Sequence, residues 1–248
     1  MKAIILAGGS GSRLGEITKI TPKPLVKVGK FPILVYIMKI YLKAGVNNFI
    51  IALGYKGEKI VKYFIKKKIN KKKLKFGLTI KKKLFNKSCN ITFLDTGKKS
   101  MTGGRLKRAA KALNEENFYV TYGDGLSNIN LKKLTKFHFQ QKKLVTITAV
   151  RPPARFGEIK IKKNKVSSFS EKRPIKTTWI NGGFFVMNRN FLRLIKNDSS
   201  ILERYPLEQA AKIGQLSAYK HTKFWQCMDT KRDRDKLNEI LNKKIIKI

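Results

Sequence analysis

A glycine-rich segment near the start of the chain carries the first side chains that could do chemistry. An apolar run at residues 3–7 is followed by three glycines, and Arg13 comes soon after them. Glycine permits positive φ angles and lets backbone N–H groups approach a ligand with no Cβ in the way. Lys23, held between two prolines, adds a second cation on a stiff segment. The pattern predicts a phosphate-binding site formed by the glycine loop, Arg13 and Lys23, and the substrate-binding residues expected along this segment are Leu6, Ala7, Gly8, Gly9, Ser10, Gly11 and Ser12.

Neither of the two common phosphate-binding glycine patterns fits this segment. A P-loop requires G-x-x-x-x-G-K-S/T, which is absent, and Leu14 occupies the position of the last glycine in the dinucleotide pattern G-x-G-x-x-G. The segment instead reads G-G-x-G-x-R, with P-K-P at residues 22–24. A strand-to-helix turn with incidental charges is the alternative interpretation.

Two aspartates are the candidate metal ligands. Asp124 lies between Gly123 and Gly125, directly after an apolar run, where open α/β sheets bind ligands. Asp229 precedes the last helical pattern of the chain. Mg²⁺ prefers a few carboxylate oxygens and usually accompanies a triphosphate, so the pair predicts a magnesium site. The structural alternatives are a turn residue at Asp124 and a helix N-cap at Asp229.

The elements that would position these side chains alternate between strand and helix. Apolar runs predict strands at residues 3–7, 48–53, 91–94, 118–122, 144–150, 180–187 and 215–219. Helical spacing predicts helices from Pro32 to about Gly45 and at 55–65, 131–141, 189–196, 206–213 and 230–243. A further helix is expected to follow the segment 95–105 and to run through Leu113. This alternation indicates an α/β fold, Rossmann-like and doubly wound, with a mostly parallel mixed sheet and helices on both faces.

Two segments depart from that alternation. Residues 66–90 are rich in lysine and predict an exposed inserted hairpin or loop, with short strands at 76–80 and 82–85. Residues 151–170 predict two paired strands. We expect one domain over residues 1–248, because no linker or internal repeat divides the chain.

The formal net charge of +41 is the most unusual feature of the composition. Most basic residues are lysines scattered along the whole chain, and the lysine runs have few interleaved aromatics for base stacking. We therefore expect nonspecific attraction of anions and no specific nucleic-acid partner. The longest apolar stretch, residues 33–38, is too short to span a bilayer, and the two cysteines make no disulfide framework. These features predict a cytoplasmic protein without a membrane partner.

Six motifs together resemble the sugar-phosphate nucleotidyltransferases. They are A-G-G-S-G-S-R-L at 7–14, P-K-P at 22–24, S-M-T-G-G-R-L-K-R at 100–108, T-Y-G-D-G at 121–125, I-N-G-G-F-F at 180–185 and F-W-Q-C-M-D-T at 224–230. The first two are shared by many members and set only the reaction class, whereas S-M-T-G-G-R is typical of the cytidylyltransferase branch. Ser12 replaces the threonine usual in that loop but keeps the hydroxyl.

The resemblance implies transfer of a cytidylyl group from CTP to glucose 1-phosphate, with Mg²⁺ on Asp124 and Asp229 and a homo-oligomeric assembly. Arg13 and Lys23 would hold the triphosphate, and Lys172 the sugar phosphate. Residues 151–248 would form the sugar-binding half and the C-terminal helix, with Glu171 accepting from sugar hydroxyls. A surface charge couple is the alternative for Glu171 and Lys172. The other implied substrate contacts are Asn181, Gly182, Gly123, Thr102, Gly104 and Arg105.

Arginine is a donor-only side chain, so Arg105 can meet the O2 and N3 acceptors of cytosine, whereas uracil and thymine present an N3–H. Thr102 or the amides of Gly103 and Gly104 would complete that contact. Arg105 could instead bind phosphate. Three other functions stay open: a nucleotidyltransferase that uses dTTP or UTP, a noncatalytic nucleotide-sensing domain, and, on charge alone, a nucleic-acid binder.

Overall fold

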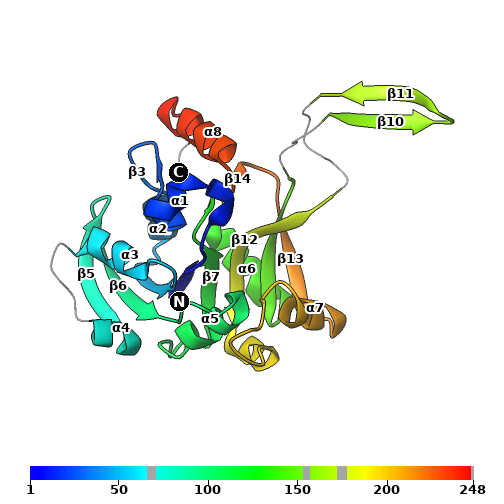
Figure 1. The fold of residues 1–248 in the computed structure, drawn as a ribbon. Helices are drawn as coiled ribbons and strands as arrows, with labels where there is room; N and C mark the ends of the chain where they lie inside the picture. Colours follow the sequence, from blue (N-terminus) through cyan, green and yellow to red (C-terminus); the bar gives the residue numbers. More distant parts are fainter. Residues whose placement is uncertain (66–70, 153–156, 172–177, 247–248) are drawn as a thin grey trace.

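The computed structural model describes residues 1–65, 71–152, 157–171 and 178–246. Its central sheet consists of β1 (Ala3–Ala7), β4 (Asn48–Leu53), β5 (Leu78–Leu84), β6 (Lys87–Asp95), β7 (Asn117–Tyr122), β9 (Val145–Val150), β12 (Ile180–Asn188) and β13 (Leu216–His221). The strand order is β13-β9-β12-β7-β1-β4-β6-β5 (Figure 1). Strands β12 and β5 run against their neighbours, and the other six run in one direction. The expected mostly parallel mixed sheet is confirmed.

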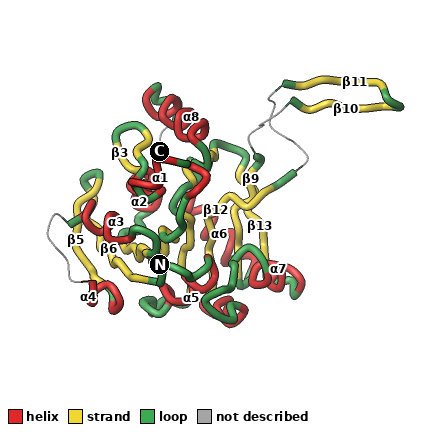
Figure 2. The backbone as a smooth tube through the Cα atoms, in the orientation of Figure 1, coloured by secondary structure: helices red, strands yellow, loops and turns green. Residues whose placement is uncertain are grey.

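Helices cover both faces of this sheet (Figure 2). The strands alternate between the faces: Ala3 and Ile5 of β1 pack into one apolar cluster, and Ile4 and Leu6 into the other. The first cluster is completed by α2 (Ile33–Lys43), α3 (Gly57–Phe64), α6 (Leu131–Gln141) and α8 (Lys231–Asn242). The second is completed by α5 (Thr102–Ala110), the 3₁₀ helix η3 (Arg189–Leu194) and α7 (Tyr205–Lys212). Short helical turns lie at η1 (Ser12–Leu14), α1 (Glu16–Ile20), η2 (Lys23–Leu25) and α4 (Lys71–Phe76).

The lysine-rich segment is an edge of the central sheet. The expectation of two short strands at 76–80 and 82–85 is wrong, because β5 is one continuous strand paired antiparallel with β6. Leu78, Ile80 and Leu84 pack against the core, and Lys82 breaks that apolar alternation in the sequence. Its ammonium donates to the Phe64 carbonyl at 3.3 Å, so the strand continues through a polar contact. Residues 66–70 of the predicted insertion lie outside the described residues.

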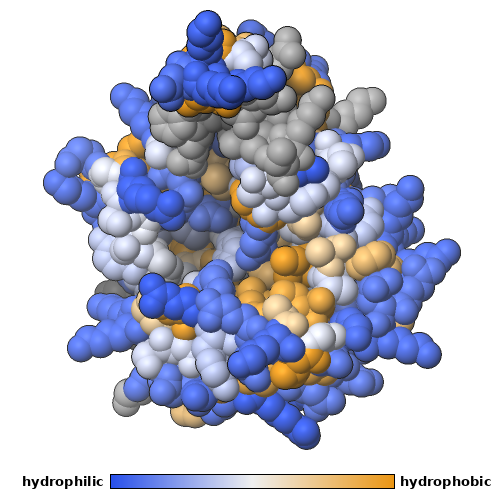
Figure 3. All heavy atoms as spheres, turned by 90° about the vertical axis from the view of Figure 1, so that its right-hand side faces the viewer, coloured by the Kyte–Doolittle hydropathy of each residue, from blue (hydrophilic) through white to orange (hydrophobic). Residues whose placement is uncertain are grey.

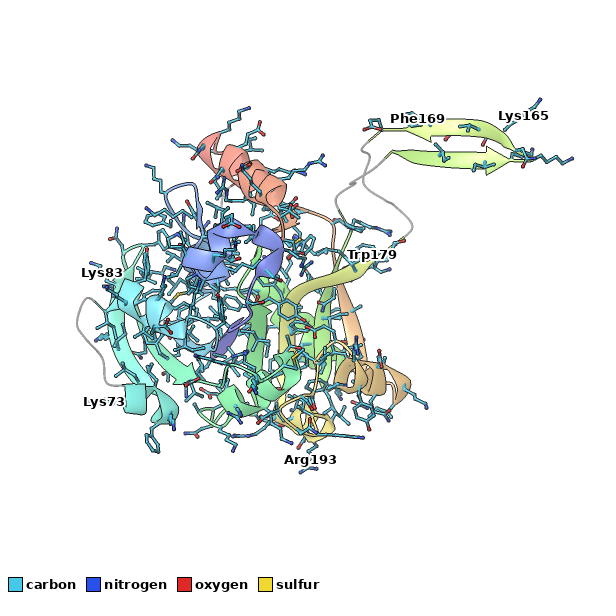
Figure 4. The ribbon with its side chains drawn as sticks, viewed as in Figure 1. Lys73, Lys83, Lys165, Phe169, Trp179 and Arg193 are labelled. Atoms are coloured by element: carbon cyan, nitrogen blue, oxygen red, sulfur yellow. The ribbon has the colours of Figure 1, made fainter. Side chains whose placement is uncertain are left out.

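In the described residues, three two-stranded sheets accompany the central one. The expected strand pair in residues 151–170 is confirmed as β10 (Glu158–Lys162) and β11 (Lys165–Ser170), a hairpin that stands off the body of the molecule (Figure 1). Lys165 and Phe169 mark it in Figure 4. The other pairs are β2 (Lys27–Val28) with β3 (Phe31–Pro32), and β8 (Gly125–Ser127) with β14 (Trp225–Cys227).

The sheet reverses its winding direction between β1 and β7. From β1 the chain adds β4 and then β6 on one side, and β7 afterwards pairs with the opposite side of β1. Such a reversal opens a crevice at the carboxyl ends of the two strands, where α/β folds bind ligands. Ala7 and Tyr122 end these strands, so the predicted loop and Asp124 meet at one place. No helix in the described ranges is long and apolar enough to cross a membrane.

Candidate active site

A cavity of about 540 Å³ lies at the carboxyl ends of β1 and β7. Its size is ordinary for a small-molecule site. The loops after both strands, the start of α5, strand β12 and strand β14 form its wall. The sequence-predicted residues in the wall are Leu6, Ala7, Gly8, Gly9, Ser10, Gly11, Ser12, Arg13, Lys23, Thr102, Arg105, Gly123, Asp124, Asn181, Gly182 and Asp229. The sequence motifs therefore converge on one cavity.

The loop after β1 presents bare backbone to this cavity. A Cβ added at Gly9 would meet no atom within 4 Å, and Gly11 has a φ of 68°, a left-handed conformation that favours glycine. Among the residues that the structure describes, the amides of Gly9, Ser10 and Gly11 donate to no other protein group. Successive free N–H groups at a turn form a concave anion site.

A cluster of charges lies beside the loop. Lys23 Nζ donates to Asp124 Oδ2 at 2.6 Å and to Asp229 Oδ1 at 2.7 Å, and its side chain is only 11% exposed. Arg13 Nη1 donates to Asp229 Oδ2 at 3.0 Å, from a side chain that is 72% exposed. Burial alone would lower the pKa of Lys23, but the charges and hydrogen bonds of Asp124 and Asp229 outweigh it and raise this pKa. Lys23 is therefore a permanent cation between two carboxylates.

Strand pairing brings the two aspartates together across the chain. Asp124 stands between β7 and β8, and β14 pairs with β8 so that Cys227 lies opposite Gly125. The amide of Met228 then donates to the Asp124 carbonyl at 2.8 Å. The N-cap of α8 is Thr230, which forms a capping box with Asp233, so the alternative role of Asp229 as that cap is wrong.

The donor set at this cluster suits Mg²⁺. Two carboxylates converge on one ammonium nitrogen, which shows that a cation fits between them. In the described part of the chain no group of three or more His, Cys, Asp or Glu could hold a metal. Two carboxylates are nevertheless sufficient, because Mg²⁺ keeps several waters and takes further oxygens from substrate phosphates.

Arg105 is buried, with 4% of its surface exposed, and its guanidinium is largely engaged by the protein. Nη1 donates to the Leu53 carbonyl at 2.6 Å and to Thr96 Oγ1 at 2.7 Å, and Nη2 donates to the Ser100 carbonyl at 2.9 Å. A guanidinium has five N–H donors, so these bonds leave part of its capacity for a ligand. Arg105 therefore supports the loop ends around the cavity.

The two glycines that precede Arg105 pack against the protein itself. The amides of Gly103 and Gly104 donate to the Ser200 carbonyl at 2.9 and 3.2 Å. A Cβ at Gly104 would lie 2.3 Å from the Asp198 carbonyl oxygen. The expectation that these amides contact the ligand is wrong, because the 198–200 loop occupies them, and Gly104 does not line the cavity.

Several further side chains line the cavity that the sequence analysis did not select, among them Tyr122, Glu203 and Trp225. Tyr122 donates its hydroxyl to Glu203 Oε1, and Thr102 donates to Glu203 Oε2 at 2.7 Å. Burial, followed by the adjacent Glu203 charge, raises the pKa of Tyr122 well above its ordinary value, so the hydroxyl keeps its proton. Trp225 Nε1 donates to the Gly182 carbonyl at 2.7 Å and ties β14 to β12. Tyr122 and Trp225 belong to quoted motifs, whereas Glu203 lies outside every one of them.

Two of the four predicted sugar contacts, Asn181 and Gly182, lie in the cavity wall with the other site residues. Both belong to β12, and Asn181 Nδ2 donates to the Tyr122 hydroxyl at 3.4 Å. Glu171 is exposed at the end of the β10–β11 hairpin and does not line the cavity, because this hairpin pairs with itself and not with the central sheet. Lys172 lies outside the described residues.

Comparisons with known proteins show the family of this chain. The family described as nucleotidyl transferase matches residues 2–230. A protein of Salmonella typhimurium (strain LT2) named glucose-1-phosphate cytidylyltransferase is 44% identical over 94% of this chain and 93% of its own length. A Bacillus subtilis protein named probable glucose-1-phosphate cytidylyltransferase is 40% identical over 98% of this chain and 96% of its own. The solved structure of a UDP-glucose pyrophosphorylase with UDP-glucose shares the fold, with a TM-score of 0.72, 17% identity and 98% coverage of both chains. The chain therefore belongs to the nucleotidyl transferase family.

Proposed function

We propose that this protein transfers a cytidylyl group from CTP to glucose 1-phosphate and releases CDP-glucose and pyrophosphate. The observation that carries the proposal is the cluster of Lys23, Asp124 and Asp229 beside a loop with free amides. The triphosphate of the nucleotide, a divalent cation and the phosphate of the sugar can be bound together at this cluster. Their reaction requires no nucleophilic side chain of the protein. The names of the 44% and 40% identical relatives supply the choice of nucleotide and sugar.

In the proposed reaction a phosphate oxygen of glucose 1-phosphate attacks the α-phosphorus of CTP, and pyrophosphate leaves from the opposite side. The attacking oxygen is already anionic, so no general base is required. Arg13, Lys23 and the amides of the 8–12 loop hold the triphosphate and neutralise charge on the leaving pyrophosphate. Asp124 and Asp229 would hold Mg²⁺, which supplies Lewis-acid stabilisation of phosphoryl charge when it is bound.

We infer that Asn181 and Gly182 contact the hexose, and their position in the cavity wall on β12 supports this role. Roles for Glu171 on the sugar hydroxyls and for Lys172 on the sugar phosphate stay predictions. The single domain, homo-oligomeric assembly and cytoplasmic location also stay predictions. An exposed apolar area among hydrophilic side chains, visible in Figure 3, supports an assembly.

Pyrophosphate release from a matrix of substrates tests the proposed function. CTP, UTP and dTTP would each be combined with glucose 1-phosphate and other hexose 1-phosphates, with Mg²⁺ present. We expect release with CTP and glucose 1-phosphate, and at least about tenfold less with UTP or dTTP. Faster release with UTP or dTTP would reassign the nucleotide. Nucleotide binding without release in any combination would indicate a nucleotide-sensing domain.

A further inference from the structure

Glu203 is the one carboxylate in the cavity lining, among the described residues, that makes no contact with the Lys23 cluster in the structure. Its two oxygens accept from hydroxyls on two different elements, Tyr122 at the end of β7 and Thr102 at the start of α5. Each carboxylate oxygen has two lone pairs, so each retains capacity to accept another hydrogen bond. The side chain is exposed and lines the cavity, so that capacity is available to a ligand.

The chemistry of this carboxylate limits what it can meet. It carries a negative charge and only accepts, so it would repel the phosphates, which the bare loop and Lys23 can hold. Its substrate partner must be a neutral donor. Thr102 lies one helical turn before Arg105 on α5, so Glu203 is attached to the same wall as the guanidinium that also lines the cavity.

Cytosine offers the complementary pattern of groups. Its O2 and N3 accept, and its exocyclic N4 amine donates, whereas uracil and thymine carry an O4 acceptor at that position. A carboxylate is the preferred protein acceptor for cytosine N4. Arg105 retains only part of its donor capacity, because Nη1 makes two protein hydrogen bonds. An acceptor opposite N4 would therefore add discrimination that Arg105 does not supply.

We propose that Glu203 is a specificity-determining residue whose carboxylate accepts a hydrogen bond from the exocyclic amine of the cytosine base. This inference rests on the proposed use of CTP. Tyr122 and Thr102 act as positioning residues, because their hydroxyls fix the orientation of the carboxylate. The amine keeps its protons when it donates this hydrogen bond, and no covalent step is involved.

The test compares CTP with the triphosphate of 2-pyrimidinone riboside, which is cytidine triphosphate without the exocyclic amine. For the wild type we expect kcat/KM to favour CTP by about tenfold or more. In Glu203→Ala the kcat/KM values for the two nucleotides should be close to equal. In Glu203→Gln the preference for CTP should be intermediate between those of the wild type and Glu203→Ala. Glu208→Ala is the matched control, because Glu208 is an exposed carboxylate on α7 outside the cavity lining.

Three outcomes would overturn the proposal. In the first, Glu203→Ala slows both nucleotides equally. In the second, the variant keeps the wild-type preference for CTP. In the third, it loses discrimination only between glucose 1-phosphate and its deoxy analogues, which would assign the carboxylate to a sugar hydroxyl. Calorimetric binding of both nucleotides without the sugar phosphate separates this question from the proposed function. A wild type that binds CTP selectively but releases no pyrophosphate would refute the transfer reaction and not the role of Glu203.

Discussion

Two glycine-rich segments border the same cavity and use glycine for opposite purposes. In the loop after β1, Gly9 faces open space, and the amides of residues 9–11 donate to no described protein group. At the start of α5, Gly103 and Gly104 press against the backbone of residues 198–200, and both amides donate to the Ser200 carbonyl. At Gly9 the first segment leaves room for a ligand, whereas at Gly103 and Gly104 the second leaves room for the protein.

The difference shows that a glycine in the sequence does not by itself indicate whether a ligand or the protein occupies the space beside it. Glycine permits close approach of another group, but that group can be a ligand or a neighbouring loop. What distinguishes the segments is the surrounding charge and chain: Lys23 lies against Gly11, whereas the 198–200 loop fills the space beside Gly104. We therefore expect substitutions around the first segment to change activity, and those in the second to change stability.

The largest effect is expected from Asp229→Asn. This change removes a carboxylate from the charge cluster but leaves Lys23 its ion pair with Asp124. We expect kcat/KM for pyrophosphate release to fall by about 10²–10³, as is typical when a preorganised electrostatic group is lost. The melting temperature should change by only a few degrees. Asp235→Asn, which alters an exposed aspartate on α8 paired with Arg234, should retain full activity. Equal losses in both variants would refute a special role for Asp229.

The second effect is a loss of stability in Gly104→Ala. The new methyl group would lie 2.3 Å from the Asp198 carbonyl oxygen and 2.4 Å from its Cα, so α5 or the 198–200 loop must move. Overpacking of this kind costs about 1–3 kcal/mol in the free energy of unfolding. Urea unfolding monitored by circular dichroism measures it. An unfolding free energy equal to that of the wild type would show that the 198–200 loop yields freely.

Much of the fold follows from local pattern in the sequence. Apolar runs such as 3–7 and 48–53 match β1 and β4, because strands buried on both faces are continuously apolar. The edge strand β5 was predicted as two pieces, because Lys81, Lys82 and Lys83 hide its single register. An edge strand has fewer neighbours to satisfy, so its sequence is less constrained and its pattern is weaker.

The site was predictable where its residues follow strand ends. Asp124 and the 8–12 loop each follow a buried strand, and parallel strands bring their carboxyl ends together. The packing of Gly104 depends on a loop about a hundred positions later in the chain, which no local pattern reveals. Glu203 was missed for the same reason, because its partners Tyr122 and Thr102 are distant in sequence. Contacts of this kind are set by tertiary packing.

The third effect concerns the cation that Lys23 supplies to the first segment. Because its ammonium sits between Asp124 and Asp229, a divalent ion must compete with it for both carboxylates. We expect Lys23→Gln to bind Mn²⁺ without nucleotide about tenfold more tightly than the wild type, since removing one nearby positive charge is worth about 1–2 kcal/mol. Titration of free Mn²⁺ by electron paramagnetic resonance measures this. Unchanged or weaker Mn²⁺ binding would show that Lys23 does not compete with the metal.

The smallest effect distinguishes the two glycine segments most directly. Gly9→Ala adds a methyl group that meets no protein atom within 4 Å, so the free energy of unfolding should stay within about 0.5 kcal/mol of the wild-type value. The methyl group would nevertheless enter the space from which phosphate oxygens reach the loop amides. A weakened hydrogen bond to a charged group should raise the KM for CTP by about three- to tenfold, with kcat little changed. Steady-state kinetics and urea unfolding on the same preparation test both parts. An unchanged KM would place the triphosphate away from this loop, whereas a loss of stability as large as that of Gly104→Ala would remove the distinction between the two segments.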